Sequence, residues 1–498
     1  MMHTVHSYIR LFCIIWINIS TITALNPIII KGQKLFDSIT KDQFFIKGVS
    51  YQPSGANQTI QDPLANADAC ARDAPLIKEL GANVIRVYEV DASQNHDACM
   101  KVLEEHGLYL VLDIGTSTSF IHREHPAYDV PIYNAYRSVV ASFVTYPHVL
   151  AFIAGNEVSN DNATTQAATY VKAVIRDMKM LMRQNKSRAV PVGYASNDDP
   201  SIRESIKDFF VCGDDEDSQA DFFGVNLYEW CGGSNFDTSG YADRTREFEA
   251  YGKPVFLSEY GCNLARPRAF DEVEAIFGPR MTPVWSGGVA YEWTQEKNDY
   301  GLVKIVDGQV QPMKDYENLK QRLTVVDPKG IHMDEYNAQP TSRQCPPITE
   351  SWKASTILPP TPSEGACRCM KENLSCVSSD AVVLSTSNAT VGAQIDIMCG
   401  LVDCGEIREE REKYGIFSSC SPADKLSRLY HLYVAGSNNS AQCDFNGYAR
   451  PALPTRNNMA LCSLIKPDIK GVPSMSTITT SSSILTVLSI VLVYTIRL

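Results

Sequence analysis

The sequence is poor in histidine and contains no long block of like charge. Only nine histidines occur among 498 residues, and none belongs to the His-Glu-x-x-His pattern of zinc hydrolases. Charged residues make up 20% of the chain, and the formal net charge is −12. Because an acidic surface repels polyanions, nucleic acid and anionic lipid are poor partner candidates, whereas a neutral polysaccharide carries no such penalty.

Cysteine, by contrast, is abundant. The chain has 15 cysteines, and Cys13 lies in a segment that we expect to be removed. The other 14 form an even set, as expected for complete pairing in an oxidising compartment. Structural zinc is the alternative use of many cysteines, but the Cys367-x-Cys369 and Cys399-x4-Cys404 spacings differ from those of a zinc ribbon.

The amino-terminal end predicts secretion. A weakly basic start is followed by the apolar run Leu11–Ile19 and the small residue Ala24, which is typical of a signal peptide over residues 1–24. A transmembrane anchor is the alternative, but the run is shorter than the ~20 residues that span a bilayer. Six Asn-x-Ser/Thr sequons follow and predict N-glycosylation. They are Asn57, Asn162, Asn185, Asn373, Asn388 and Asn438.

The carboxyl-terminal end predicts a glycolipid anchor. Residues 471–483 are small and polar and residues 484–496 are almost wholly apolar, as in a GPI-attachment signal. We expect attachment at Ser474, with Gly471 and Ser476 as rivals, and removal of residues 475–498. The mature protein would then be held at the outer leaflet of the plasma membrane. A membrane-spanning tail is the alternative.

Eight short apolar runs between residues 25 and 340 alternate with stretches of helical periodicity. Most are rich in Val, Ile, Phe and Tyr, as strands buried on both sides should be. The runs lie at 44–51, 83–90, 108–114, 149–157, 190–196, 221–230, 254–261 and 288–294. This pattern predicts an α/β fold, a (β/α)8 barrel. An open doubly wound sheet is the alternative, but no glycine-rich phosphate loop follows the first run.

A barrel places its active groups at the carboxyl ends of its strands. Glu157 ends the fourth run and Glu259 ends the seventh, and these two strands lie nearly opposite across a barrel mouth. Cleaving a glycosidic bond needs a proton donor and a second carboxylate. If the two carboxyls are about 5–5.5 Å apart, the second acts as nucleophile and configuration is retained. Solvated surface glutamates are the alternative interpretation of these residues.

The composition changes after the predicted barrel. A proline-containing linker covers 341–365, and a segment at 366–463 holds eight cysteines. A unit this small buries a limited core, which predicts a separate disulfide-stapled module. Residues 464–474 then form a short tail to the anchor site.

The motifs themselves resemble a known family. GVSYQP, VIRVYEVD, FIAGNEVSN, VPVGYASNDD and PVFLSEYGCN are similar to segments of the fungal β-1,3-glucanosyltransferases of glycoside hydrolase family 72. The likeness runs in order from about residue 44 to residue 345. The segment beginning CRCMKENLSC resembles the mainly helical carbohydrate-binding module of family 43.

The resemblance implies a role for each strand-end residue. Glu157 would be the general acid and base, and Glu259 the nucleophile. Asn156 would bind the 2-hydroxyl of the sugar at the cleaved bond, and Tyr228 would hold Glu259. Further residues would line the sugar subsites: Gln52, Tyr88, Asp113 and Tyr291.

The implied reaction transfers a β-1,3-glucan chain to a second glucan, with retention and without a metal or organic cofactor. Its partners would be donor and acceptor glucans, and nothing in the sequence demands a partner subunit, so we expect a monomer. A glucan hydrolase using the same glutamates is one alternative. A wall protein that only binds glucan and an adhesin are the others.

The resemblance also implies the disulfide pairing. In the barrel it gives Cys70–Cys99, Cys212–Cys345 and Cys231–Cys262. In the module it gives Cys367–Cys420, Cys369–Cys462, Cys376–Cys443 and Cys399–Cys404. Tyr414, Tyr430 and Tyr433 are candidates for glucan binding in the module, but we favour core packing for each.

Overall fold

The computed structural model describes residues 24–52, 62–339, 341–379, 388–410, 412–437, 443–455 and 458–465. The anchor candidates Gly471, Ser474 and Ser476, the sequons Asn57 and Asn438, and all of the signal peptide except Ala24 lie outside these ranges. No helix within them is long and apolar enough to cross a membrane.

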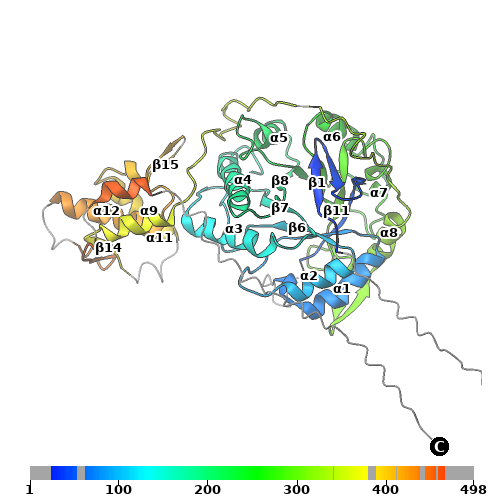
Figure 1. Ribbon diagram of the computed structural model, residues 1–498, viewed down its shortest axis with the longest axis horizontal. Helices are drawn as coiled ribbons and strands as arrows, with labels where there is room; N and C mark the ends of the chain where they lie inside the picture. The colour runs from blue at the N-terminus through cyan, green and yellow to red at the C-terminus, as the bar shows by residue number, and fades with distance from the viewer. Residues whose placement is uncertain are drawn as a thin grey trace, which may run out of the picture.

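Eight parallel strands close into a barrel with the order β10-β11-β4-β5-β6-β7-β8-β9 (Figure 1). The strands are β4 (Ile46–Ser50), β5 (Val84–Val87), β6 (Tyr109–Asp113), β7 (Val149–Asn156), β8 (Val192–Asn197), β9 (Phe223–Asn226), β10 (Val255–Tyr260) and β11 (Trp285–Ala290). The barrel prediction is confirmed, and the doubly wound alternative is wrong. Seven strands follow the predicted runs closely, whereas β11 begins three residues before its run.

The apolar runs form strands because both of their faces are buried. In β6, Leu110 and Leu112 pack with the helices, while Tyr109 and Val111 belong to a second cluster inside the barrel. This alternation is the two-residue period of a strand. The interior cluster extends to Ile28 of an antiparallel sheet that was not predicted. That sheet, β1 (Ile28–Lys31), β2 (Lys34–Asp37) and β3 (Gln43–Phe44), covers the amino-terminal end of the barrel.

Helices follow the strands and cover the outside of the barrel. They are α1 (Ala67–Glu79), α2 (Asp97–Glu105), α3 (Val130–Phe143), α4 (Ala167–Gln184), α5 (Arg203–Val211), α6 (Tyr241–Phe248), α7 (Glu272–Ile276) and α8 (Lys314–Leu323). Local chemistry fixes several of their starts. Asn66 and Asp129 each accept a backbone N–H of the first helical turn, as good N-cap residues do. A hairpin of β12 (Val303–Val306) and β13 (Gln309–Pro312) precedes α8.

The cysteine-rich segment forms a second, mainly helical unit with its own core. Its elements are α9 (Glu364–Glu372), β14 (Cys376–Ser378), α11 (Asn388–Cys399), β15 (Glu409–Glu410), β16 (Lys413–Tyr414), α12 (Pro422–Ser437) and β17 (Ala449–Pro451). Tyr430 is fully buried there and stacks on Phe445, with ring centroids 4.2 Å apart. Core packing is therefore confirmed for Tyr430. Tyr433 also packs against Phe445.

Seven disulfides join the same pairs that the family resemblance implies. Three lie in the barrel region and four in the module. Their Cα–Cα separations run from 5.1 to 5.8 Å, within the usual range for a disulfide. Because these bonds use every cysteine except Cys13, the zinc alternative does not fit.

The module lies beside α3 and α4 of the barrel (Figure 1). Val130 N–H donates to the Ser419 carbonyl at 2.8 Å, and Tyr128 N–H donates to Glu409 Oε1 at 3.1 Å. The linker also packs on α4, where Thr361 Oγ1 donates to Asp177 Oδ1 at 2.7 Å. These contacts agree with the packing expected from a short connector.

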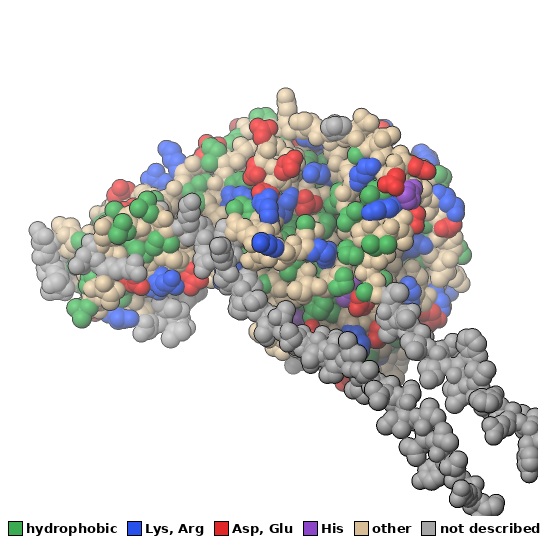
Figure 2. All heavy atoms as spheres, in the orientation of Figure 1, with side chains coloured by type: hydrophobic (Ala, Val, Ile, Leu, Met, Phe, Trp, Pro, Cys, Tyr) green, Lys and Arg blue, Asp and Glu red, His purple; other side chains and the backbone are tan. Residues whose placement is uncertain are grey.

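Acidic and basic side chains are interspersed over the face shown in Figure 2, as the sequence indicates. Two sequons, Asn162 and Asn185, are exposed. Asn373 is instead buried, and its Nδ2 donates to the Cys369 carbonyl at 2.8 Å, which disfavours glycan attachment there. For Asn388 the structure describes the backbone alone.

Candidate active site

The carboxyl ends of the barrel strands surround a cavity of about 430 Å³. Four of the predicted substrate residues line it: Gln52, Tyr88, Asp113 and Asn156. Glu157 follows β7 directly, and Glu259 lies near the end of β10. Strands β8 and β9 separate β7 from β10, so both glutamates reach the same end of the barrel.

Glu259 is held by three donors. Tyr228 donates its hydroxyl to Oε2 at 2.7 Å, and Tyr88 donates its hydroxyl to Oε1 at 2.9 Å. Arg86 Nη1 lies 3.2 Å from the same Oε1. The residue is 8% exposed, and both carboxylate oxygens are therefore fixed in place.

The ionisation of Glu259 reflects a balance of opposed effects. Burial raises the pKa of Glu259 above its usual value, and the nearby Glu157 charge adds to the rise. The Arg86 charge and the hydrogen bonds from Tyr228 and Tyr88 oppose it. Since such donors favour the charged form of a carboxyl, the ionised state of Glu259 depends on these three side chains.

Arg86, which was not predicted from the sequence, is the centre of the network. It is fully buried and makes a bidentate pair with Asp113, with Nε–Oδ1 at 3.1 Å and Nη2–Oδ2 at 3.0 Å. Its Nη2 also donates to Asn156 Oδ1 at 3.1 Å. Burial lowers the pKa of Arg86, but the charges of Asp113, Tyr88 and Glu259 outweigh this and raise it overall.

Asn226, the last residue of β9, was also missed. Its Nδ2 donates to Glu157 Oε1 at 2.7 Å and to Asn156 Oδ1 at 3.0 Å. Ser258 donates its hydroxyl to Asn226 Oδ1 at 2.7 Å, which fixes the amide orientation. A continuous chain of contacts therefore runs from Glu157 through Asn226, Asn156 and Arg86 to Glu259. Because Asn156 uses Oδ1 for both contacts, its Nδ2 is the group available to a ligand.

Aromatic rings gather above Glu259. Tyr291 lies edge-on to Tyr88, Tyr228 and Tyr300, with ring centroids 6.3, 6.5 and 5.2 Å apart. Tyr300 was not predicted as a site residue, because it does not lie at the end of an apolar run. Tyr260, the neighbour of Glu259, is fully buried, as expected for a core residue.

Gln52 and Asp113 have structural contacts as well as positions in the cavity wall. Gln52 Oε1 accepts from the backbone N–H groups of Tyr88 and Glu89 at 2.9 and 3.1 Å. Both carboxylate oxygens of Asp113 accept from Arg86. Each residue therefore positions a neighbour, in addition to any contact with a sugar.

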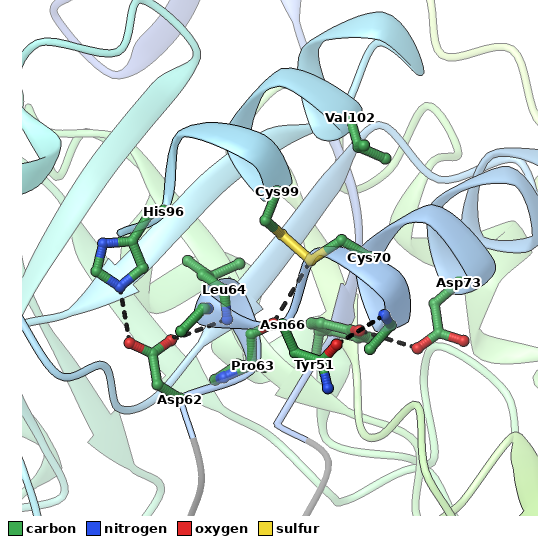
Figure 3. Close-up of a disulfide and its surroundings, with 12 residues drawn as sticks. Tyr51, Asp62, Pro63, Leu64, Asn66, Cys70, Asp73, His96, Cys99 and Val102 are labelled. Atoms are coloured by element: carbon green, nitrogen blue, oxygen red, sulfur yellow. Dashed lines mark hydrogen bonds and ion pairs between the residues drawn. A yellow bond between two sulfur atoms is a disulfide. The ribbon is translucent and has the colours of Figure 1, made fainter. Parts of the chain in front are cut away.

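Figure 3 shows the support behind this wall. The Cys70–Cys99 bond joins α1 to α2, and Tyr51 donates to Asp73 Oδ2 of α1 at 2.9 Å. His96 Nε2 lies 2.7 Å from Asp62 Oδ2. A second disulfide, Cys231–Cys262, joins the segment after β9, which carries Tyr228, to the segment just after β10, the strand that carries Glu259.

Comparison with known proteins identifies the family. A model described as glucanosyltransferase matches residues 17–327. The chain belongs to the glucanosyltransferase family. A second model, the X8 domain, matches residues 374–450, inside the cysteine-rich module.

Several similar proteins match most of this chain. Protein EPD1 of Candida maltosa is 43% identical over 85% of this chain and 78% of its own length. The 1,3-beta-glucanosyltransferase GAS2 of Saccharomyces cerevisiae is 43% identical over 84% of this chain and 78% of its own. A solved structure of a mutant Saccharomyces cerevisiae Gas2p, in complex with laminaritetraose and laminaripentaose, has a TM-score of 0.81 at 40% identity. The match covers 88% of this chain and 97% of the Gas2p chain.

Proposed function

We propose that this chain is a retaining 1,3-β-glucanosyltransferase. It cleaves a β-1,3-glucan chain internally and transfers the new reducing end to the non-reducing end of a second chain. The observation that carries the proposal is the network from Glu157 to Glu259 at the barrel mouth, in a member of the glucanosyltransferase family. The complex of the Gas2p relative with laminari-oligosaccharides supports glucan as the substrate.

In the first step, Glu259 attacks the anomeric carbon while Glu157 gives its proton to the leaving oxygen. The glycosidic bond breaks, and a covalent bond forms between the sugar and Glu259. Tyr228, Tyr88 and Arg86 hold the attacking carboxylate. Asn156 donates from Nδ2 to the 2-hydroxyl of the sugar whose anomeric carbon is attacked.

In the second step, the hydroxyl of an acceptor glucan attacks the anomeric carbon and passes its proton to Glu157. The bond to Glu259 breaks, the carboxylate is restored, and a longer glucan leaves with its original configuration. Tyr88, Tyr228 and Tyr291 offer ring faces to the apolar faces of the sugars. If water attacked instead, the same residues would act as a hydrolase.

The sequence signals support an activity outside the cell. We propose secretion, GPI attachment at Ser474 and action in elongation and remodelling of the fungal cell wall. Glycosylation at the exposed Asn162 and Asn185 fits this location. The module would bind glucan beside the barrel, and the working unit would be a monomer.

The test is incubation of residues 25–470 with a β-1,3-gluco-oligosaccharide of one length, followed by separation of products by size. We expect products longer than the substrate, and none from Glu157→Gln or Glu259→Gln. Glu317→Gln, at an exposed position on α8, is the matched control and should behave as the unchanged protein. Shorter products alone would establish a hydrolase. No conversion, with glucan still retained in a pull-down, would favour the binding-protein alternative.

A further inference from the structure

The segment between β6 and α3, residues 114–129, forms one wall of the catalytic cavity. Phe120 and His122 line this cavity together with Asn156 and Tyr88. Phe120, His122 and His125 form a row of rings with nearly parallel planes. Neighbouring centroids lie 5.9 and 5.8 Å apart, and the planes are inclined by 28° and 20°.

These rings are accessible although they belong to a cavity wall. Phe120 is 47% exposed, and His122 and His125 are exposed as well. A single exposed apolar residue needs no explanation, but a row of rings that continues a substrate cavity has the composition of a ligand site. None of the three rings contacts either catalytic glutamate in the described structure, so the proposed chemistry leaves them unused.

The histidine in the middle of the row has a fixed orientation. His122 Nδ1 accepts from the backbone N–H groups of Glu124 and His125, each at 3.3 Å. An accepting Nδ1 places the ring proton on Nε2, so His122 has a donor left for a ligand. The segment is held at its other end by the module, through Tyr128 and Val130.

We infer that Phe120 and His122 form an outer sugar subsite, which takes a glucose ring of β-1,3-glucan beyond the rings next to the cleaved bond. The inference rests on the proposed function and adds a determinant of chain length. The Phe120 ring covers the apolar face of the glucose. His122 Nε2–H and the side chains of Arg123 and Glu124, which line the same cavity, serve its hydroxyls.

The variants separate a sugar contact from a structural role. Phe120→Ala removes the ring, and Phe120→Tyr keeps it. His122→Asn removes the ring but keeps an oxygen that can accept from the same backbone N–H groups, as Asn does in turns. Ile39→Ala is the control, because Ile39 is 70% exposed and lies at the amino-terminal end of the barrel.

The measurement is kcat/KM over a series of β-1,3-gluco-oligosaccharides of increasing length. We expect Phe120→Ala and His122→Asn to lower kcat/KM about 5- to 10-fold for long substrates, the range expected for one aromatic contact. The shortest substrate that is cleaved should be unaffected. Phe120→Tyr should recover most of the kcat/KM that Phe120→Ala loses, and Ile39→Ala should match the unchanged protein. Equal losses at every length, or no loss at any length, would overturn the subsite.

A binding experiment keeps this test independent of the proposed reaction. The affinity of Glu259→Gln for a long oligosaccharide is measured by calorimetry with and without Phe120→Ala. A 5- to 10-fold weaker Kd supports the subsite even if the unchanged protein makes no transfer product, in which case the proposed function alone fails. An unchanged Kd overturns the subsite and leaves the transfer assay to decide the function.

Discussion

The barrel and the module are stabilised in different ways. The barrel has a large apolar core in two clusters, one inside the barrel and one beneath the helices, and three disulfides spread between Cys70 and Cys345. The module has one small core, and four disulfides lie within residues 367–462. A small unit buries too little apolar surface to be stable alone, and covalent links offset this deficit.

The barrel and the module also differ in how deeply their ion pairs are buried. The barrel buries Arg86, Asp113 and Glu259 together, which requires a rigid scaffold that keeps every partner in place. In the module, Lys425 and Arg428 are also buried, but their partners Glu409 and Glu406 remain partly exposed. The barrel core therefore supports a fully enclosed charge network, whereas the module relies on its disulfides to keep its fold.

Removing one disulfide from each region should give the largest contrast. Cys369 and Cys462 are 93 residues apart, and Cys70 and Cys99 are 29 apart. Changing both partners to Ser should cost about 4–5 kcal/mol in the module and about 3–4 kcal/mol in the barrel by loop entropy. In calorimetry we expect the module transition to vanish, while the barrel variant melts lower but cooperatively. A module transition that survived would contradict this view of its stability.

Arg86→Met should damage the barrel more than any surface charge change. It leaves Asp113 and Glu259 buried without their cation, which should cost about 3–5 kcal/mol in unfolding free energy. It should also raise the pKa of Glu259 further, so residual activity should increase as the pH is raised. Arg246→Met, which removes an exposed pair with Asp243, is the control and should cost under about 1 kcal/mol. Equal losses in urea unfolding would refute the role given to Arg86.

Glu272 should make the stability of the barrel depend on pH. Burial raises the pKa of Glu272 from 4.5 to about 7, so the folded state holds this proton more tightly than the unfolded state. The stabilisation that protonated Glu272 gives the folded state is fully present below pH 4.5 and is lost as the pH rises through 7. At about 1.4 kcal/mol per pKa unit, the loss is about 3 kcal/mol. Urea unfolding at several pH values should show Glu272→Gln losing less stability over this window than the unchanged protein. Parallel pH curves would rule out this assignment.

Tyr228→Phe tests the site with the smallest change, one hydroxyl. Without its donor to Glu259 Oε2, we expect kcat to fall about 10- to 100-fold, or about 1.4–2.7 kcal/mol, with little change in KM. Tyr251→Phe is a matched control, since its buried hydroxyl donates at 2.6 Å to the Lys207 carbonyl, away from the cavity. It should lose about 1 kcal/mol of stability and no activity. Equal kcat values for the two variants would exclude the proposed role of Tyr228.

The sequence predicted the barrel because its strands are buried on both faces and read as continuous apolar runs. Glu157 and Glu259 stood out because a polar side chain at the end of such a run is unusual. Arg86 was hidden for the same reason, since it lies inside a run that was interpreted as apolar. Its charge is tolerated there through the bidentate pair with Asp113, a contact between two strands that no local pattern encodes.

Other features depended on contacts between distant segments. Asn226 ends β9 two positions before Tyr228, and only the barrel closure brings it to Glu157. The sheet at residues 28–44 was missed because its strands are short and only partly buried. The disulfide pairing could not come from spacing, since many connectivities are compatible with the same cysteines.

The two ends of the module lie together, and this determines how it would carry a mechanical load. Ser363 donates its hydroxyl to the Ile465 carbonyl at 3.4 Å, and Cys462 is bonded to Cys369 of α9. A pulling force on the chain beyond Ile465 would pass through this covalent bond into α9 and the linker. The module core would bear little of that tension, so its fold would persist while the chain on either side is stretched.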